Sequence, residues 1–131
     1  MLFFVIAGGA VPSSGTPKTT ELVGINPPSV KQGPPLPEDF KNHCSVLVGD
    51  EAYLIGGSLT SKKVLAIDIR TSTMTYKSEL LYERPFGPTC ALIKGSNSKI
   101  VVIGGEDLNS PENLPIEVFN IGSSTWSKGK R

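Results

Sequence analysis

The stretch that governs the fold is Ala52-Tyr53-Leu54-Ile55-Gly56-Gly57, an apolar run that ends in a pair of glycines. Two further runs are of the same kind, Phe4-Val5-Ile6-Ala7-Gly8-Gly9 and Val101-Val102-Ile103-Gly104-Gly105. The first glycines of successive pairs are 48 residues apart in both intervals. A run of strand-forming residues before two glycines predicts a β-strand whose end needs unusual backbone angles or a close approach of another segment. The equal spacing predicts an internal structural repeat.

The repeat continues on both sides of the glycine pairs. A second apolar run follows each pair and ends in a polar turn residue, namely Asn26, Asp68 and Asn120. Met74 and Trp126 then share one position at the start of a third expected strand, where the first copy has Lys31-Gln32. A large apolar side chain there is expected to pack between neighbouring sheets. Upstream of the later pairs, matched runs begin at Cys44 and Cys90, so each complete unit is expected to contain four short strands and no helix.

The composition agrees with a turn-rich β-protein and argues against several classes of function. The 131 residues include 14 glycines and 11 prolines, and 13 basic against 12 acidic side chains leave a net charge of +1. This balance argues against nucleic-acid binding and against a polybasic membrane anchor. No apolar run reaches the roughly 18 residues that span a bilayer. The opening run, residues 1–7, lacks a basic start and is expected to be a strand rather than a secretory signal.

Four-stranded units of about 50 residues are typical of kelch repeats, and the chain resembles the kelch-repeat β-propellers. The resemblance rests on the three glycine pairs, on Trp126, and on the apolar residues of the following strand, Ile25, Ile67 and Phe119. It implies an all-β fold of kelch-type blades, each a four-stranded antiparallel meander, in repeats 1–36, 37–82 and 83–131. Met74 departs from the Trp usual in the family. The strands that begin at Cys44 and Cys90 would be innermost.

The expected strand count implies an open, partial propeller. The first repeat lacks its innermost strand and the third ends as its outermost strand starts, which leaves eleven strands in about three blades. Closed propellers have roughly four to eight blades. The chain is therefore expected to be a fragment of a larger propeller, or a shortened product that needs further blades or self-association to cover its open ends.

The ionisable residues predict no catalytic, cofactor or metal site. The one histidine, His43, is expected to make a local hydrogen bond near the channel mouth. Cys44 and Cys90 occupy equivalent positions in successive repeats and are interpreted as buried free thiols, with their pairing left open. The acidic pairs Asp50-Glu51 and Glu106-Asp107 each lie beside a turn, where solvated carboxylates are ordinary, and neither is expected to be an acid/base couple.

Loops at one end of the blades are the best candidates for function, because loops on a rigid scaffold usually carry recognition. They comprise residues 10–20, 32–42, 58–63, 79–88 and 106–115. Within them, the candidate partner contacts are Lys62, Lys63, Arg84 and Phe86, since Arg and aromatic side chains contribute strongly to binding energy.

These loops predict a non-catalytic protein-protein interaction module that binds a protein or peptide. The family resemblance further implies a substrate-recognition part of a ubiquitin-ligase adaptor. Two alternatives stay open, a fragment of a kelch-propeller enzyme such as an oxidase or sugar epimerase, and a truncated product without independent function. The low cysteine count and the absence of an Asn-x-Ser/Thr sequence favour a cytoplasmic location, with a secreted form not excluded.

Overall fold

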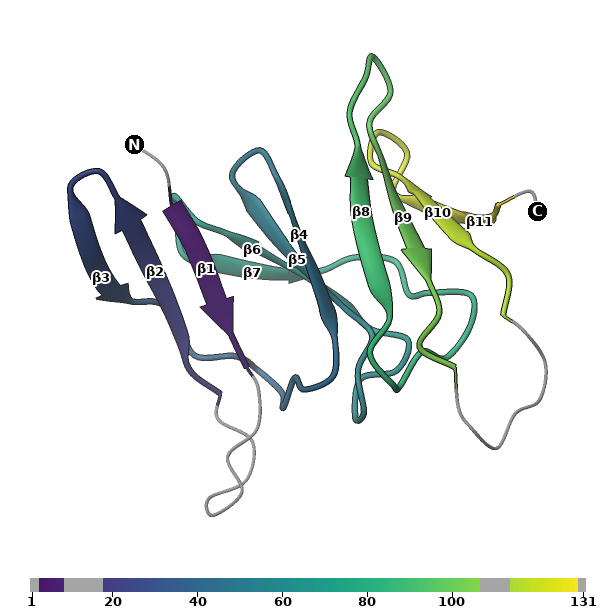
Figure 1. Cartoon of the computed structure of the whole chain (residues 1–131), viewed down its shortest axis with the longest axis horizontal. Helices are drawn as coiled ribbons and strands as arrows, with labels where there is room; N and C mark the ends of the chain where they lie inside the picture. The colour runs from purple at the N-terminus through teal and green to yellow at the C-terminus, as the bar shows by residue number, and fades with distance from the viewer. Residues whose placement is uncertain (1–2, 9–17, 107–113, 130–131) are drawn as a thin grey trace.

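Three antiparallel β-sheets follow one another along the chain in the computed structural model, which describes residues 3–8, 18–106 and 114–129 (Figure 1). Within these residues there are eleven strands and no helix, so the all-β expectation is confirmed. The first sheet contains β1 (Phe3–Ala7), β2 (Thr20–Ile25) and β3 (Pro28–Gln32). The middle sheet contains β4 (Cys44–Val48), β5 (Glu51–Ile55), β6 (Val64–Asp68) and β7 (Thr73–Tyr76). The last sheet contains β8 (Thr89–Ile93), β9 (Lys99–Ile103), β10 (Glu117–Asn120) and β11 (Thr125–Lys128).

Each sheet is a meander in which every strand pairs with the next one along the chain. The first, middle and last sheets lie within residues 1–36, 37–82 and 83–131, respectively. In Figure 1 they stand side by side in chain order. Short turns join the strands of one sheet, and longer linkers join one sheet to the next.

The glycine pairs end equivalent strands with the same backbone geometry. Gly8, Gly56 and Gly104 follow β1, β5 and β9 with φ angles of 72, 72 and 73°. Gly57 and Gly105 also have positive φ, and a Cβ atom on Gly105 would lie 2.8 Å from the backbone nitrogen of Pro88. Only glycine adopts such angles without strain and permits such an approach. The sequence prediction for these positions is confirmed, while Gly9 lies outside the described residues.

The polar residues that end the following strands form the turns expected of them. Asp68 accepts hydrogen bonds at Oδ1 from the backbone amides of Arg70 (2.9 Å) and Thr71 (3.2 Å). Asn120 accepts the equivalent bond from the amide of Ser123 at 3.2 Å. These side chains satisfy backbone donors that the strand ladder leaves free, and they reverse the chain into β7 and β11.

The middle sheet is buried on both faces, which explains its continuous apolar runs. One face, which we call its forward face, packs on the last sheet, and the residues in this contact are Tyr53, Ile55, Val64 and Ala66 from the middle sheet with Ile100, Val102 and Phe119 from the last. The opposite, back face packs on the linker that follows the first sheet, through Ala52, Leu54, Leu65 and Ile67 against Leu36 and Phe40. One hydrophobic cluster therefore joins the middle sheet to the last sheet, and a second joins it to the linker that follows the first sheet.

Trp126 packs at the contact between the middle and last sheets, as the sequence predicted. It pairs in register with Phe119, and the two ring centroids are 4.8 Å apart. Its indole Nε1 donates a hydrogen bond to the carbonyl of Ser78, in the linker from the middle sheet, at 2.8 Å. Met74 occupies the same register position in the middle sheet, opposite Ile67.

The first copy differs from its prediction at this position. Val30 pairs with Val23 in the register of the Trp126 and Met74 pairs, so an apolar side chain occupies the position assigned to Lys31-Gln32. The register also makes Val23, and not Ile25 as expected, the counterpart of Ile67 and Phe119. The strand runs two residues further before a tight turn at Asn26, which brings Pro28 directly opposite Ile25.

Cys44 and Cys90 form a disulfide between the middle and last sheets, with Cα atoms 5.9 Å apart. The interpretation as free thiols is wrong because the two positions are not equivalent in register. Cys44 pairs with Ile55. The counterpart of Ile55 in the last sheet is Ile103, and Ile103 pairs with Thr89. Cys90 is one residue further on, and successive strand residues point to opposite faces, so the two sulfurs face each other. The bond removes one reason for expecting a reducing compartment.

Candidate functional site

The loop between β5 and β6 and the linker between β7 and β8 lie side by side at one end of the sheets (Figure 1). We call residues 58–63 and 79–88 together the loop surface. Three hydrogen bonds join its two segments, from the amide of Leu80 to Lys62 O (2.9 Å), from the amide of Arg84 to Ser61 O (2.8 Å), and from Ser58 Oγ to Pro85 O (3.4 Å). The two segments therefore form one continuous surface.

The linker is held further by the glycine-pair ends of the neighbouring strands. The amide of Gly57 donates to Arg84 O at 3.0 Å, and the amide of Phe86 donates to Gly105 O at 3.2 Å. A Cβ atom on Gly56 would lie 2.9 Å from Arg84 O, closer than side chains tolerate. The glycine pairs thus position the linker as well as ending their strands.

Arg84 is buried beneath the loop surface and is not available to contact a partner. Its side chain is fully buried with that of Glu117, and Nε donates to Glu117 Oε2 at 2.7 Å. The two terminal nitrogens donate to the carbonyls of Gly104 (2.7 Å) and Pro115 (2.5 Å). The other carboxylate oxygen of Glu117 accepts from the amide of Leu81 at 2.5 Å. This corrects the sequence expectation for Arg84, whose guanidinium instead anchors the linker to the last sheet.

A burial of this kind requires complete pairing, since an isolated charge in the interior is very costly. Arg84 uses its fork of donors on one carboxylate and two carbonyls, an arrangement that lysine could not reproduce. The partners belong to two segments of the last sheet, the end of β9 and the start of β10. Arg84 therefore fixes where the linker runs, which makes it a structural residue of the loop surface.

Lys63 is held by a carboxylate from the preceding linker. Its Nζ lies 2.5 Å from Oε1 of Glu38 and 5.7 Å from the centre of the Tyr76 ring. The hydroxyl of Tyr76 donates a hydrogen bond to the other oxygen of Glu38. The bonds from Lys63 and then from Tyr76 lower the pKa of Glu38, while burial and the bond to Glu38 raise the pKa of Tyr76 to about 12.

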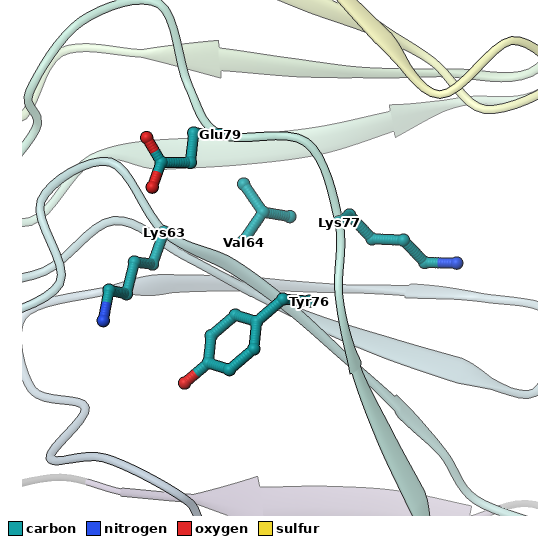
Figure 2. A pocket seen from close by; sticks show the side chains of 5 residues that line it. All are labelled: Lys63, Val64, Tyr76, Lys77 and Glu79. Atoms are coloured by element: carbon teal, nitrogen blue, oxygen red, sulfur yellow. The ribbon is translucent and has the colours of Figure 1, made fainter.

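A small open hollow of about 200 Å³ borders this group, and its lining residues are Lys63, Val64, Tyr76, Lys77 and Glu79 (Figure 2). In this view Lys63 and Tyr76 point to the same side and Lys77 extends away from them. The amino group of Lys77 lies 3.7 Å from Oε2 of Glu51. Both lysines that line the hollow therefore already have a carboxylate partner.

His43 lies half-buried just before β4, with its ring edge-on to Phe40 at 5.7 Å between centroids. Its Nδ1 is buried and has no hydrogen-bond partner, so the expected local bond is not made at this atom. Burial lowers the pKa of the imidazole. In the described parts of the chain, no group of three or more His, Cys, Asp and Glu side chains is arranged to hold a metal ion.

The loop surface exposes large apolar side chains. Phe86, a sequence candidate, is 52% exposed, and the structure adds Leu59 at 63% and Leu81 at 44%. Lys62 is half-buried, and its carbonyl accepts the hydrogen bond from the amide of Leu80. Leu59 lies between two polar residues and could have been singled out in the sequence, whereas Leu81 adjoins Leu80 and Tyr82 and carried no such signal. Of the other expected loops, most of 10–20 and 106–115 lies outside the described residues.

Comparison with known proteins gives no relative from which to take a function. No protein family matches the sequence, and no curated protein matches it either. Among the residues that the structure describes, no helix is long and apolar enough to cross a membrane.

Proposed function

We propose that the chain is a non-catalytic protein-protein interaction module built from kelch-type propeller blades. Three observations support the blade architecture. Successive sheets are antiparallel meanders, the glycine pairs recur every 48 residues, and their first members share φ angles of 72, 72 and 73°. Stacked units of this kind, each covered by the next, are the basis of repeat architectures.

The binding role rests on one observation, the exposure of Leu59, Leu81 and Phe86 on a loop surface whose backbone is held by hydrogen bonds to the neighbouring strands. Exposed apolar side chains in a cluster are typical of interaction sites. Fixed loops bind at low entropic cost because little ordering is required on association. The bonds from Arg84 to Glu117, Gly104 and Pro115 supply that rigidity.

The chemistry of the surface favours binding over catalysis. Its buried cation, Arg84, is fully used by structural partners, and Lys63 is engaged by Glu38. What remains for a ligand is the exposed apolar side chains, with the exposed carboxylates of Glu79 and Glu83 on the same surface. A suitable ligand is a peptide segment with two or three apolar anchors, as in the recognition of a substrate by a ubiquitin-ligase adaptor.

Selection from a displayed peptide library, followed by titration, tests this proposal. Peptides selected on the full chain should bind the Phe86→Ala and Leu59→Ala variants about tenfold or more weakly, because central apolar anchors contribute over about 1 kcal/mol each. Leu47→Ala is the matched control, since Leu47 is a similarly exposed apolar residue at the far end of β4. The proposal fails if no peptide is selected, or if selected peptides bind both loop variants as tightly as the wild type.

A further inference from the structure

Alternation along the last sheet gives it an aliphatic face opposite the middle sheet, on which one residue is exposed and three are half-buried. Ile100, Val102 and Phe119 point into the contact with the middle sheet. Since successive strand residues point to opposite faces, the forward face of the last sheet carries Val101, Ile103, Ile116 and Val118. Val101 and Val118 pair directly across the strands, and Ile103 is 49% exposed.

The same face of the middle sheet shows what such a surface does. Its residues at the matching register positions are Tyr53, Ile55, Val64 and Ala66. All four are buried, and the back face of the last sheet covers them. The forward face of the last sheet is therefore a second copy of a surface that this chain already uses for stacking one sheet on the next.

The first sheet presents the complementary surface. Val23 of β2 pairs with Val30 of β3, and this pair has the same register position as Phe119 and Trp126 in the last sheet. The last sheet contacts the middle sheet through Phe119 and Trp126. Val30 is 69% exposed, and Ile25, on the same face, is also exposed. The β2–β3 part of this back face thus matches the position and apolar character of a stacking surface, with Val30 and Ile25 exposed and Val23 half-buried.

From these two faces we infer that two copies of the chain associate head to tail, the forward face of each last sheet stacking on the back face of the partner copy's first sheet. The contact is heterologous, because two different surfaces meet. Each copy contributes three antiparallel sheets to this stack. This inference rests on the blade architecture of the proposed function and not on the peptide-binding role.

Sedimentation velocity of the full, oxidised chain tests the inference. The wild type is expected to sediment with twice the mass of one chain. Ile103→Lys and Val30→Glu each place a charge on one of the two faces, and each variant alone is expected to sediment as a monomer. Both residues are exposed within one chain, so neither change disturbs its own packing. Leu59→Lys is the control, since it adds the same charge to the loop surface and is expected to leave the dimer intact.

Mixing the two monomeric variants gives the sharpest result. The forward face is intact in Val30→Glu and the back face is intact in Ile103→Lys, so the mixture should recover a dimer, aided by the Lys–Glu pair at the second contact. Near-ultraviolet circular dichroism of Trp126 confirms that each variant is folded. A monomeric wild type overturns the inference, as does a dimer that only Ile103→Lys disrupts, or a mixture that stays monomeric. Loss of peptide binding in a chain that still dimerises would instead count against the proposed function alone.

Discussion

The middle and last sheets contain equivalent central strands, yet they bury them differently. In the middle sheet, β5 and β6 are buried at nearly every position. In the last sheet, β9 and β10 alternate between buried and half-buried or exposed residues. The apolar content of these strands is similar, and what differs is the neighbour on the forward face. Burial in this fold is therefore decided by stacking between sheets rather than by the sequence of a strand alone.

The largest expected effect comes from breaking the ion pair at the junction of the two sheets. Arg84→Ala leaves the buried carboxylate of Glu117 without its partner, and removal of one member of a buried pair costs about 3–5 kcal/mol. Denaturant unfolding of the variant measures this loss. The double variant Arg84→Met/Glu117→Leu should regain most of it, since no charge is then left buried. If Arg84→Ala lowers the free energy of unfolding by no more than an exposed substitution does, Arg84 does not anchor the linker.

The next effect compares equivalent isoleucines in the two sheets. Ile55→Ala removes a fully buried side chain and should cost about 2–5 kcal/mol, whereas Ile103→Ala, at an exposed position, should cost under about 1 kcal/mol. The measurement uses a chain that also carries Val30→Glu, so that self-association does not contribute. Equal losses at the two positions would mean that the forward faces do not differ in burial.

A smaller effect separates the two glycines that end these strands. Gly56→Ala and Gly104→Ala share the strain of a positive φ, about 1–2 kcal/mol. A Cβ atom on Gly56 also meets Arg84 O at 2.9 Å, whereas one on Gly104 has no neighbour within 4 Å. Thermal unfolding should therefore show a lower midpoint for Gly56→Ala than for Gly104→Ala. The reverse order would argue against a close approach of the linker to β5.

The smallest effect is the pH dependence of the Glu38 contacts. The hydrogen bonds from Lys63 and then from Tyr76 hold the pKa of Glu38 below its ordinary value of 4.5. Folding therefore favours the ionised form, so its stabilisation is present above that value and is lost as the pH falls through the lower folded-state pKa. The wild type should exceed Glu38→Gln in stability by under about 1 kcal/mol at neutral pH, since the pair is part-exposed. The difference should vanish in acid, and a pH-independent difference would contradict this assignment.

Much of the architecture could be predicted from the sequence because it depends on local patterns. The glycine pairs mark strand ends through their backbone freedom, and Asp68 and Asn120 form turns with amides two or three residues away. The register of the paired strands was harder to predict from the sequence. With the longer turn before β9, Thr89 and not Cys90 takes the register position of Cys44, and this offset of one residue decides whether the two sulfurs face each other.

The loop surface was predicted in place but not in chemistry. Arg84 is charged and lies in a polar loop, so the sequence indicated exposure. Its burial depends on Glu117, which is 33 residues away and whose position is known only once β10 is placed. The same holds for Lys63, whose carboxylate partner Glu38 comes from a different linker. Long-range pairing of charges decides which charged loop residues are free, whereas Phe86 is exposed as the sequence predicted.

Hydrogen–deuterium exchange of the wild-type chain with a selected peptide tests the binding account most directly. Protection on addition of the peptide should be confined to residues 58–63 and 79–88, with β4–β6 and β8–β10 unchanged. Protection centred instead on Val101, Ile103 and Val118, or no change at any described residue, would contradict the assignment of the loop surface as the site of protein recognition.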